Sequence, residues 1–252
     1  MKNIKRDTEI EMNRYNKRAL QKIDFLDEQE LSIWHLPPIQ TYYRFIQNNI
    51  NSNSKVLEIG AGTGNHSQVV LDTGAYLFAT DVSKESLKVL DRRFKAYKKL
   101  QTKSMDMESI EFEDKTFDCV VSAGSLSYGD NHLVMAEIHR VLKEGGKFIC
   151  LDSFNHNPIY RISRRIRVLI GQRTRSTIRN MPTIKLLTKY EQKFGKLEVN
   201  YFGSIIWLAP TLALLFGNSR AARIINFVDR LIGVRKSAFK IVFVAQKEPK
   251  SN

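Results

Sequence analysis

The sequence predicts an α/β fold with a parallel, doubly wound sheet, and three observations support this prediction. Short apolar runs alternate with longer helical segments between residues 55 and 152. A glycine-rich loop follows the first of these runs directly, and acidic or small polar residues end the later ones. Strands that alternate with helices are typical of a sheet covered by helices on both faces. We therefore expect one α/β domain in the middle of the chain.

The first apolar run, residues 56–59, leads into Gly60-Ala61-Gly62-Thr63-Gly64 and then into a predicted helix. Glycine adopts positive φ and has no Cβ atom, so the backbone of such a loop can approach a ligand closely. Asn65 stands where the dinucleotide fingerprint Gly-x-Gly-x-x-Gly has its third glycine. The spacing therefore argues against NAD and leaves another cofactor, or a tight turn without a ligand, as the interpretations.

Four further runs are predicted to be strands, over residues 76–80, 100–105, 117–122 and the segment after Gly145-Gly146, which is interpreted as a helix stop. Asp81 follows Glu58 by 23 positions, and an acid at the end of the second strand can accept hydrogen bonds from ribose hydroxyls. Ligands of such sheets bind beyond the carboxyl ends of the strands. The loop at 60–64, Asp81, Asp106, residues 122–128 and residues 152–157 are therefore expected along one edge.

These segments, over about residues 50–152, resemble the class I S-adenosylmethionine-dependent methyltransferases, and among them the ubiquinone- and menaquinone-biosynthesis type. The resemblance implies a Rossmann-like, seven-stranded sheet of order 3-2-1-4-5-7-6, with N-terminal helices and with helical insertions before the last two strands. It implies S-adenosyl-L-methionine as the cofactor, with the acid at 106 bonding the adenine amino group and its neighbour packing on the ring. The residues expected to bind the cofactor are Glu58, Gly60, Ala61, Gly62, Gly64, Asp81, Val82, Asp106, Met107 and Ser122.

Methyl transfer from a sulfonium mainly requires alignment and exclusion of water, and it needs a base only where the acceptor must lose a proton. The candidates on the predicted edge are Tyr128, His132 and His156, for which capping or positioning is the alternative role. His66 is expected to touch the cofactor, and His139 is expected to be structural. Cys119 and Cys150 fall in predicted central strands without a Cys/His cluster, so no metal site is expected.

The net charge of +14 is confined to the C-terminal part of the chain. Residues 1–150 contain 21 Lys or Arg and 21 Asp or Glu, whereas residues 151–252 contain 19 and 5. This asymmetry indicates a negatively charged partner, such as anionic lipid, nucleic acid or a phosphorylated substrate. The first 18 residues are charged throughout, unlike a secretory signal. A cytoplasmic location is therefore expected, with peripheral binding to the inner face of the membrane as a further expectation.

A basic helical insertion is predicted over about residues 153–190. Seven arginines lie between Arg161 and Arg179, and Ile159, Ile162, Ile166 and Leu169 recur at helical spacing. A basic amphipathic helix is typical of a segment that binds a membrane surface. The alternative is a solvated charged face above a packed apolar stripe. Nucleic acid is disfavoured, because the arginines alternate with isoleucines and not with stacking aromatics. The residues after the fourth strand, Ser122-Ala123-Gly124-Ser125, also lack the Asp/Asn-Pro-Pro-Tyr motif of amino-methylating enzymes that act on bases.

The remaining segments complete the predicted organisation: a helical cap over residues 1–50, interrupted at Pro37-Pro38, and a methyltransferase domain over 51–252. Its last strands are expected at 196–203 and 239–245, with an insertion at about 205–236 between them. The apolar residues 205–216 are expected to lie on a membrane, to cap the cleft or to form a buried core helix. Pro210 and the polar residues around it argue against a membrane span. A second amphipathic helix, over 220–233, is expected to have Arg220, Arg223 and Arg230 on its polar side.

These observations predict methyl transfer from S-adenosylmethionine to a small-molecule or lipid-linked acceptor at a membrane surface. The acceptor would be isoprenoid- or quinone-like or a cell-envelope glycan precursor. The second possibility follows from a fainter resemblance of Met181-Pro182-Thr183 and Phe202-Gly203 to methyltransferases of bacterial cell-envelope and lipid pathways. An RNA methyltransferase and a non-catalytic scaffold with the cofactor fold are the alternatives.

Overall fold

The computed structural model describes residues 36–171, 173–232 and 235–249, together with residues 9, 10, 12, 13 and 16. Most of the helical cap predicted over residues 1–50 therefore lies outside the described residues. Its last helix, α2 (Leu36–Asn49), is described.

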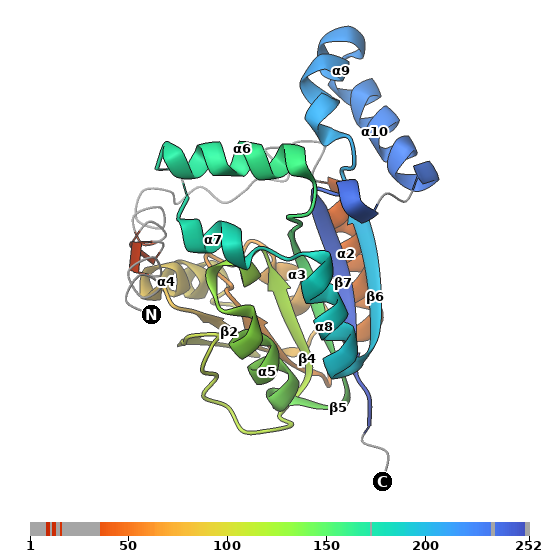
Figure 1. Ribbon diagram of the computed structural model, residues 1–252. Coiled ribbons are helices and arrows are strands. Elements are labelled where there is room, and N and C mark those ends of the chain that lie inside the picture. Colours follow the sequence, from red (N-terminus) through yellow and green to blue (C-terminus); the bar gives the residue numbers. More distant parts are fainter. Residues whose placement is uncertain are drawn as a thin grey trace.

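The centre of the molecule is a seven-stranded sheet of order β3-β2-β1-β4-β5-β7-β6 (Figure 1). All strand pairs from β3 to β5 are parallel, and β7 runs antiparallel between β5 and β6. The predicted strand order is confirmed. The strands are β1 (Lys55–Ile59), β2 (Tyr76–Asp81), β3 (Leu100–Ser104), β4 (Phe117–Ala123), β5 (Leu142–Ser153), β6 (Gly195–Phe202) and β7 (Lys240–Lys247).

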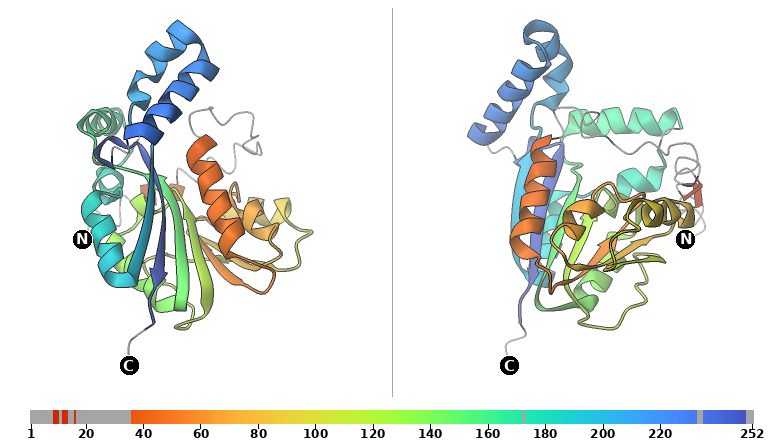
Figure 2. Two further views of the ribbon diagram at one scale, coloured as in Figure 1. Left: turned by 90° about the vertical axis from the view of Figure 1, so that its right-hand side faces the viewer. Right: turned by 180° about the vertical axis from the view of Figure 1, so that it is seen from behind.

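Helices cover both faces of this sheet (Figure 2). On one face, α2, α3 (Ser67–Leu71) and α4 (Lys84–Arg93) enclose a core cluster that contains Tyr42, Ile46 and Val70. On the other face, α5 (Asn131–Val141) and α8 (Ile184–Phe194) enclose a second cluster. Successive residues of a strand point to opposite faces, and Val56 and Leu57 of β1 accordingly belong to different clusters.

Two glycine or proline signals lie near the ends of helices or strands. Pro37 and Pro38 lie in the first turn of α2, where proline is tolerated because the first N–H groups of a helix have no helical partner. The segment before Leu36, which the prolines are predicted to separate from this helix, lies outside the described residues. Gly145 and Gly146 are not a helix stop, since α5 already ends at Val141 and β5 begins at Leu142. They lie where the pairing of β4 with β5 shifts register, and Gly145 has φ of +77°.

The two insertions form helices at the carboxyl edge of the sheet. Residues 153–190 contain α6 (Pro158–Leu169), α7 (Arg175–Asn180) and the start of α8. Between β6 and β7 lie η3 (Ile206–Leu208), α9 (Ala209–Phe216), α10 (Asn218–Ile232) and η4 (Arg235–Ser237). The two helices α9 and α10 pack against each other as a hairpin that projects from the sheet (Figures 1 and 2). None of the described helices is long and apolar enough to cross a membrane.

Candidate functional site

The loops after β1 to β5 meet at the carboxyl edge of the sheet, because these five strands are parallel. Backbone hydrogen bonds join them directly. Ala61 N donates to Thr80 O at 2.9 Å, Met105 N to Asp81 O at 3.1 Å and Gly124 N to Leu151 O at 2.8 Å. The edge on which the sequence predicted a ligand site is therefore one continuous surface.

The three glycines of the first loop all have positive φ, but they meet different surroundings. A Cβ atom at Gly60 would lie 2.3 Å from the Cβ atom of Ser125, and one at Gly64 would lie 2.7 Å from the ring of Phe94. A Cβ atom at Gly62, whose φ is +56°, would meet nothing within 4 Å. Gly60 and Gly64 thus allow close packing inside the protein, whereas Gly62 faces open space above the edge.

Asp81 holds this loop at the end of the next strand. Gly62 N donates to Asp81 Oδ2 at 2.9 Å, and Ser83 N donates to Oδ1 at 2.8 Å. Burial raises the pKa of Asp81, and these two N–H bonds oppose the rise. A carboxylate accepts about four hydrogen bonds, so Asp81 retains acceptor capacity for a ligand.

Glu58 lies beneath the same loop as a buried acid. Ser67 Oγ donates to its Oε2 at 2.6 Å. Burial raises the pKa of Glu58 to about 7, with Asp81 adding to the rise and the Ser67 hydrogen bond opposing it. Glu58 and Asp81 together place two acids under the loop, an arrangement suited to a ligand that carries positive charge.

The adenine-binding residues implied by the resemblance lie at the ends of β2 and β3. Asp106 is exposed, and its Oδ1 accepts a hydrogen bond from Glu108 N at 2.9 Å. Met107 is half-buried against the core, and Val82 is exposed. An accessible carboxylate beside two apolar side chains fits a flat, polar-edged ring.

Ser122 has a partner within the protein. It is buried, and its Oγ lies 2.5 Å from Ser125 Oγ, which in turn donates to Ile59 O at 3.2 Å. Ser122 and Ser125 thereby fix the loop after β4 against the end of β1, beside Gly60.

The three candidate bases lie in separate environments. Tyr128 is half-buried in η2 (Leu126–Tyr128), and His156 is half-buried after β5, with its ring stacked on Phe154 at 6.1 Å between centroids. His132 is exposed in the first turn of α5, where its Nε2 lies 2.7 Å from Lys189 Nζ. Because an ammonium only donates, this contact occupies the lone pair that His132 would need as a base.

His66 and His139 also have partners within the protein. His66 precedes α3, its Nδ1 lies 3.0 Å from Tyr43 Oη, and its ring meets Tyr42 edge to face. Burial, assisted by Lys240 and Arg93, lowers the pKa of His66 to about 4. The imidazole is therefore neutral at pH 7. His139 packs edge to face on Phe194, 5.2 Å away between ring centroids.

A buried acid lies at the end of β5, on the predicted edge, although the sequence analysis gave it no role in the site. Asp152 accepts from Leu126 N at 3.0 Å and from Ser153 N at 2.6 Å, so it fixes the turn that contains Tyr128. Burial raises the pKa of Asp152 to about 6, while Lys240 and Arg164 oppose the rise. The signal in the sequence was its position as the last acid before a long basic segment. Its two cationic neighbours come from β7 and α6, which no local pattern brings together.

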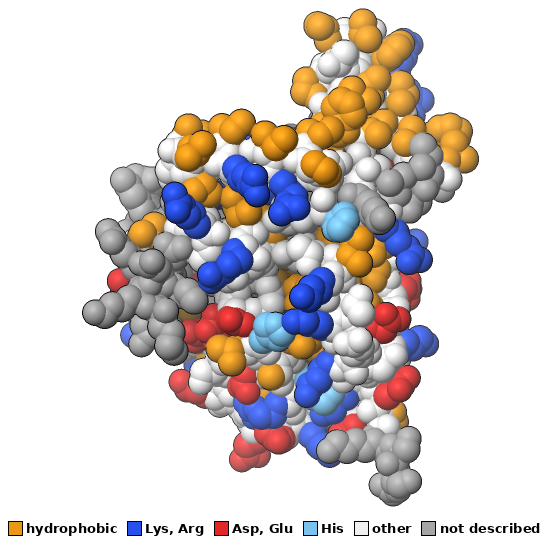
Figure 3. Space-filling model, in the orientation of Figure 1, with side chains coloured by type: hydrophobic (Ala, Val, Ile, Leu, Met, Phe, Trp, Pro, Cys, Tyr) orange, Lys and Arg blue, Asp and Glu red, His pale blue; other side chains and the backbone are white. Residues whose placement is uncertain are grey.

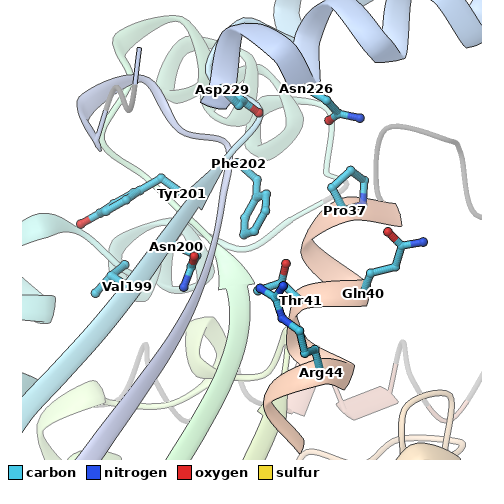
Figure 4. Close-up of a pocket in the computed structure, with 10 residues that line it drawn as sticks. All are labelled: Pro37, Gln40, Thr41, Arg44, Val199, Asn200, Tyr201, Phe202, Asn226 and Asp229. Carbon is cyan, nitrogen blue, oxygen red and sulfur yellow. The ribbon is translucent and has the colours of Figure 1, made fainter. Parts of the chain in front are cut away.

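A hollow with a volume of about 680 Å³ lies at the β6 edge of the sheet (Figure 4). Polar side chains from α2, β6 and α10 line much of it, including Arg44, Asn200 and Asn226. It contains none of the residues predicted for cofactor binding or catalysis.

The middle of the chain is similar to known methyltransferases. A family model described as a methyltransferase domain matches residues 57–150. Sterol 4-C-methyltransferase strm-1 of Caenorhabditis elegans is 33% identical over 112 residues, which cover 43% of this chain and 34% of that protein. Demethylmenaquinone methyltransferase of Tropheryma whipplei is 30% identical over 122 residues, which cover 46% of this chain and 50% of that protein. The chain thus spans between about a third and a half of these relatives' own lengths.

A solved structure extends the likeness to most of the fold. Geranyl diphosphate C-methyltransferase from Streptomyces coelicolor A3(2), in complex with geranyl diphosphate and S-adenosyl-L-homocysteine, matches with a TM-score of 0.58 and 15% identity. The match covers 82% of this chain and 79% of that chain. At this identity the likeness concerns the fold.

Proposed function

We propose that the protein transfers a methyl group from S-adenosylmethionine to a small-molecule or lipid-linked acceptor, because residues 57–150 match the model of a methyltransferase domain. The main observation is the glycine loop after β1, in which Gly62 faces open space while its N–H is held by Asp81. A side chain at Gly62 would fill the space into which a ligand fits.

The residues around the loop suit the parts of this cofactor. When bound, S-adenosylmethionine supplies an electrophilic methyl group on a positively charged sulfonium. Asp81 retains acceptor capacity for ribose hydroxyls, and Asp106, Met107 and Val82 offer one polar and two apolar surfaces for adenine. Gly60, Ala61, Gly62 and Gly64 provide the backbone against which the cofactor lies, and Ser122 positions the neighbouring loop. Glu58, the second acid under the loop, favours a cationic ligand.

The acceptor is proposed to be isoprenoid- or quinone-like, or a lipid-linked glycan precursor, met at a membrane surface. The names of the relatives refer to a sterol, to demethylmenaquinone and to geranyl diphosphate, which are hydrophobic or prenylated molecules. The basic and apolar helices α6, α9 and α10 leave the sheet at the edge that carries the candidate site. If the acceptor carries a hydroxyl, then Tyr128 and His156 are the groups proposed to accept its proton, and His132 would first have to release Lys189.

The test is incubation of the full chain with isotopically labelled S-adenosylmethionine and, separately, with lipid extract, water-soluble extract and total RNA, followed by mass spectrometry. Label is expected in the lipid extract, and the Gly62→Val variant should transfer none. Label confined to RNA would replace the proposal with the nucleic-acid alternative. Absence of label in all three, together with undiminished cofactor binding, would favour a scaffold.

A further inference from the structure

We propose that the outward face of α6 and the α9–α10 hairpin together form a docking face for an anionic lipid bilayer. This docking face is defined by the exposed apolar residues Ile159, Ile162, Ile166, Leu169 and Ile170 of the α6 segment and Trp207, Leu214, Leu215, Phe216, Phe227 and Leu231 of the hairpin segment. The inference deepens the membrane part of the proposed function and rests on that function for its purpose. The evidence for the docking face itself is the exposure of these apolar side chains and the charge of the residues around them.

The orientation of α6 is set by two buried residues on its inner side. Tyr160 Oη donates to Gly203 O at 2.8 Å. Arg164 Nη1 donates to Phe154 O at 2.7 Å and to Asn155 Oδ1 at 3.1 Å, and its guanidinium lies 5.2 Å from the ring centroid of Phe239. Residues 160 and 164 are one turn apart. The inner side of α6 is thus fixed to the segments that follow β5 and β6 and to the one that precedes β7.

The isoleucines occupy the opposite side of α6. At 100° per residue, positions 159, 162 and 166 lie between about a third and half a turn from the side that contains 160 and 164. Ile162 is 59% exposed and Leu169 is 80% exposed. The alternative in which this stripe packs beneath a solvated charged face is therefore wrong. Arg164, one of the seven arginines of the predicted basic segment, is buried and does not belong to the charged surface. A globular protein normally turns such a stripe toward its core.

In the hairpin, too, apolar side chains that a globular protein normally buries are exposed. All eight residues of α9 are described, and Ala209 alone is buried, whereas Leu214 is 87% exposed. The buried-helix alternative for residues 205–216 is therefore wrong. In α10, Phe227 and Leu231 are exposed on the side that also contains Arg220 and Arg223, so this side is not purely polar.

Both parts of the docking face lie at the edge that carries the candidate site. The strands β5 and β6 are parallel, since each pairs antiparallel with β7. The helix α6 follows the end of β5, and α9 follows the end of β6. Figure 3 shows hydrophobic side chains along α6 and over the hairpin, with Lys or Arg side chains beside α6.

The charges around the docking face favour an anionic surface over other occupants. Exposed arginines on α6, α7 and α10 are Arg161, Arg165, Arg167, Arg175, Arg179, Arg220 and Arg223. The sequence has no acid between Asp152 and Glu191. Asp229 of α10 accepts hydrogen bonds from Gly203 N and Ser204 N, which engage both of its oxygens within the protein.

The other possible occupants fit the docking face less well. A second copy of the chain would bring like charges together, and nucleic acid would leave the apolar side chains uncovered. An anionic bilayer offers negative charge to the arginines and an apolar interior to the exposed apolar side chains. Each Lys or Arg near the surface and each apolar side chain that enters the interface adds affinity.

The experiment is co-sedimentation of the full chain with vesicles of phosphatidylglycerol and phosphatidylcholine, and with vesicles of phosphatidylcholine alone. The wild type should bind the mixed vesicles and lose most binding on the neutral ones. The double variants Ile162→Gln/Ile166→Gln and Leu214→Gln/Leu215→Gln should each lower the partition coefficient by about tenfold or more, because their apolar side chains no longer enter the interface. Arg165→Gln/Arg167→Gln should reduce binding to the anionic vesicles and its salt dependence.

Tyr76→Gln is the matched control, because Tyr76 is 46% exposed, close to the 52% of Ile166, and begins β2 at the opposite edge of the sheet. This variant should bind vesicles as the wild type does. Thermal unfolding and S-adenosylmethionine affinity, measured on every variant, should not change. Vesicle binding without any methyl transfer would contradict the proposed function alone. Failure of the wild type to bind anionic vesicles would overturn the docking face. If light scattering then shows a dimer that the leucine variants abolish, the face is an interface between copies.

Discussion

The glycine-loop region and the docking face depart from the usual distribution of polar and apolar side chains in opposite directions. At the loop, the carboxyl group of Glu58 and the hydroxyl of Ser122 are buried and hydrogen-bonded within the protein. At the docking face, isoleucines and leucines of α6 and α9 are exposed. Buried polar groups and large exposed apolar patches are the informative exceptions in a protein surface. This contrast is consistent with the proposals that the loop binds a small charged ligand and that the docking face binds an anionic bilayer.

Neighbouring residues of α6 show the same contrast on a smaller scale. Arg164 is buried with three acceptors around its guanidinium, whereas Arg165 is exposed. Residue type therefore does not distinguish an arginine that holds a helix in place from one that meets the solvent. The following predictions separate the two regions, beginning with the largest expected effect.

Substitution of Gly62 in the loop, or of Asp81 beside it, should weaken cofactor binding without changing vesicle binding. The wild type should bind S-adenosylmethionine with a dissociation constant of tens of micromolar or tighter, about −6 to −8 kcal/mol. Gly62→Val should weaken this by about a hundredfold or more, because a branched side chain strains φ of +56° and fills the open space. Asp81→Ala should weaken it by about tenfold or more through loss of the Gly62 hydrogen bond. Calorimetry measures both, and undiminished affinity in both variants would reject this site.

Ionisation of Glu58 should make the free protein less stable as the pH rises. Its pKa is about 7 in the folded state against 4.5 for the ordinary group. Below about pH 4.5 the Glu58 carboxyl group is neutral in both the folded and the unfolded state, and its favourable contribution to the free energy of unfolding is fully present. Between these two pKa values the unfolded chain ionises first, so the free energy of unfolding falls, by about 3 kcal/mol in total.

The variant Glu58→Gln should lack this fall, as measured by urea unfolding at a series of pH values. The same change at the exposed Glu113 should leave the pH dependence as in the wild type. A Glu58→Gln curve that still parallels the wild type would show that another group is responsible.

The two neighbouring arginines should differ in their effect on stability. Arg164→Ala should lower the free energy of unfolding by about 2 kcal/mol, because buried carbonyl groups such as Phe154 O lose their donor. Arg165→Ala should change it by less than about 0.5 kcal/mol. Chemical denaturation compares the variants directly. Equal losses would mean that the inner and outer sides of α6 are not distinct.

The smallest effect is expected from NAD, which should not raise the melting temperature measurably. Asn65 occupies the position where the dinucleotide fingerprint has glycine. Thermal unfolding with NAD and with S-adenosylmethionine at equal concentrations makes the comparison. Equal stabilisation by the two ligands would contradict the specificity expected of the loop.

The features that could be predicted from sequence are those with a local physical signal. The glycine loop was recognisable because positive φ and a missing Cβ atom require glycine at particular positions. The parallel sheet followed from apolar runs separated by helices, and the strand order, which the family resemblance implied, is confirmed. Asp81 was identified from its distance to Glu58, and its carboxylate holds the N–H of Gly62.

The features that required the folded structure depend on contacts between distant segments. Helical periodicity showed that α6 has an apolar side and a basic side, but it could not show which side meets the protein. That orientation depends on Gly203, Phe239 and Asn155, which Tyr160 and Arg164 reach only after the sheet has formed. In the same way, Asp152 and Lys240 are 88 positions apart and become neighbours through the pairing of β5 with β7. Local sequence specifies which groups are available, and the partner each group meets is set by packing across the whole fold.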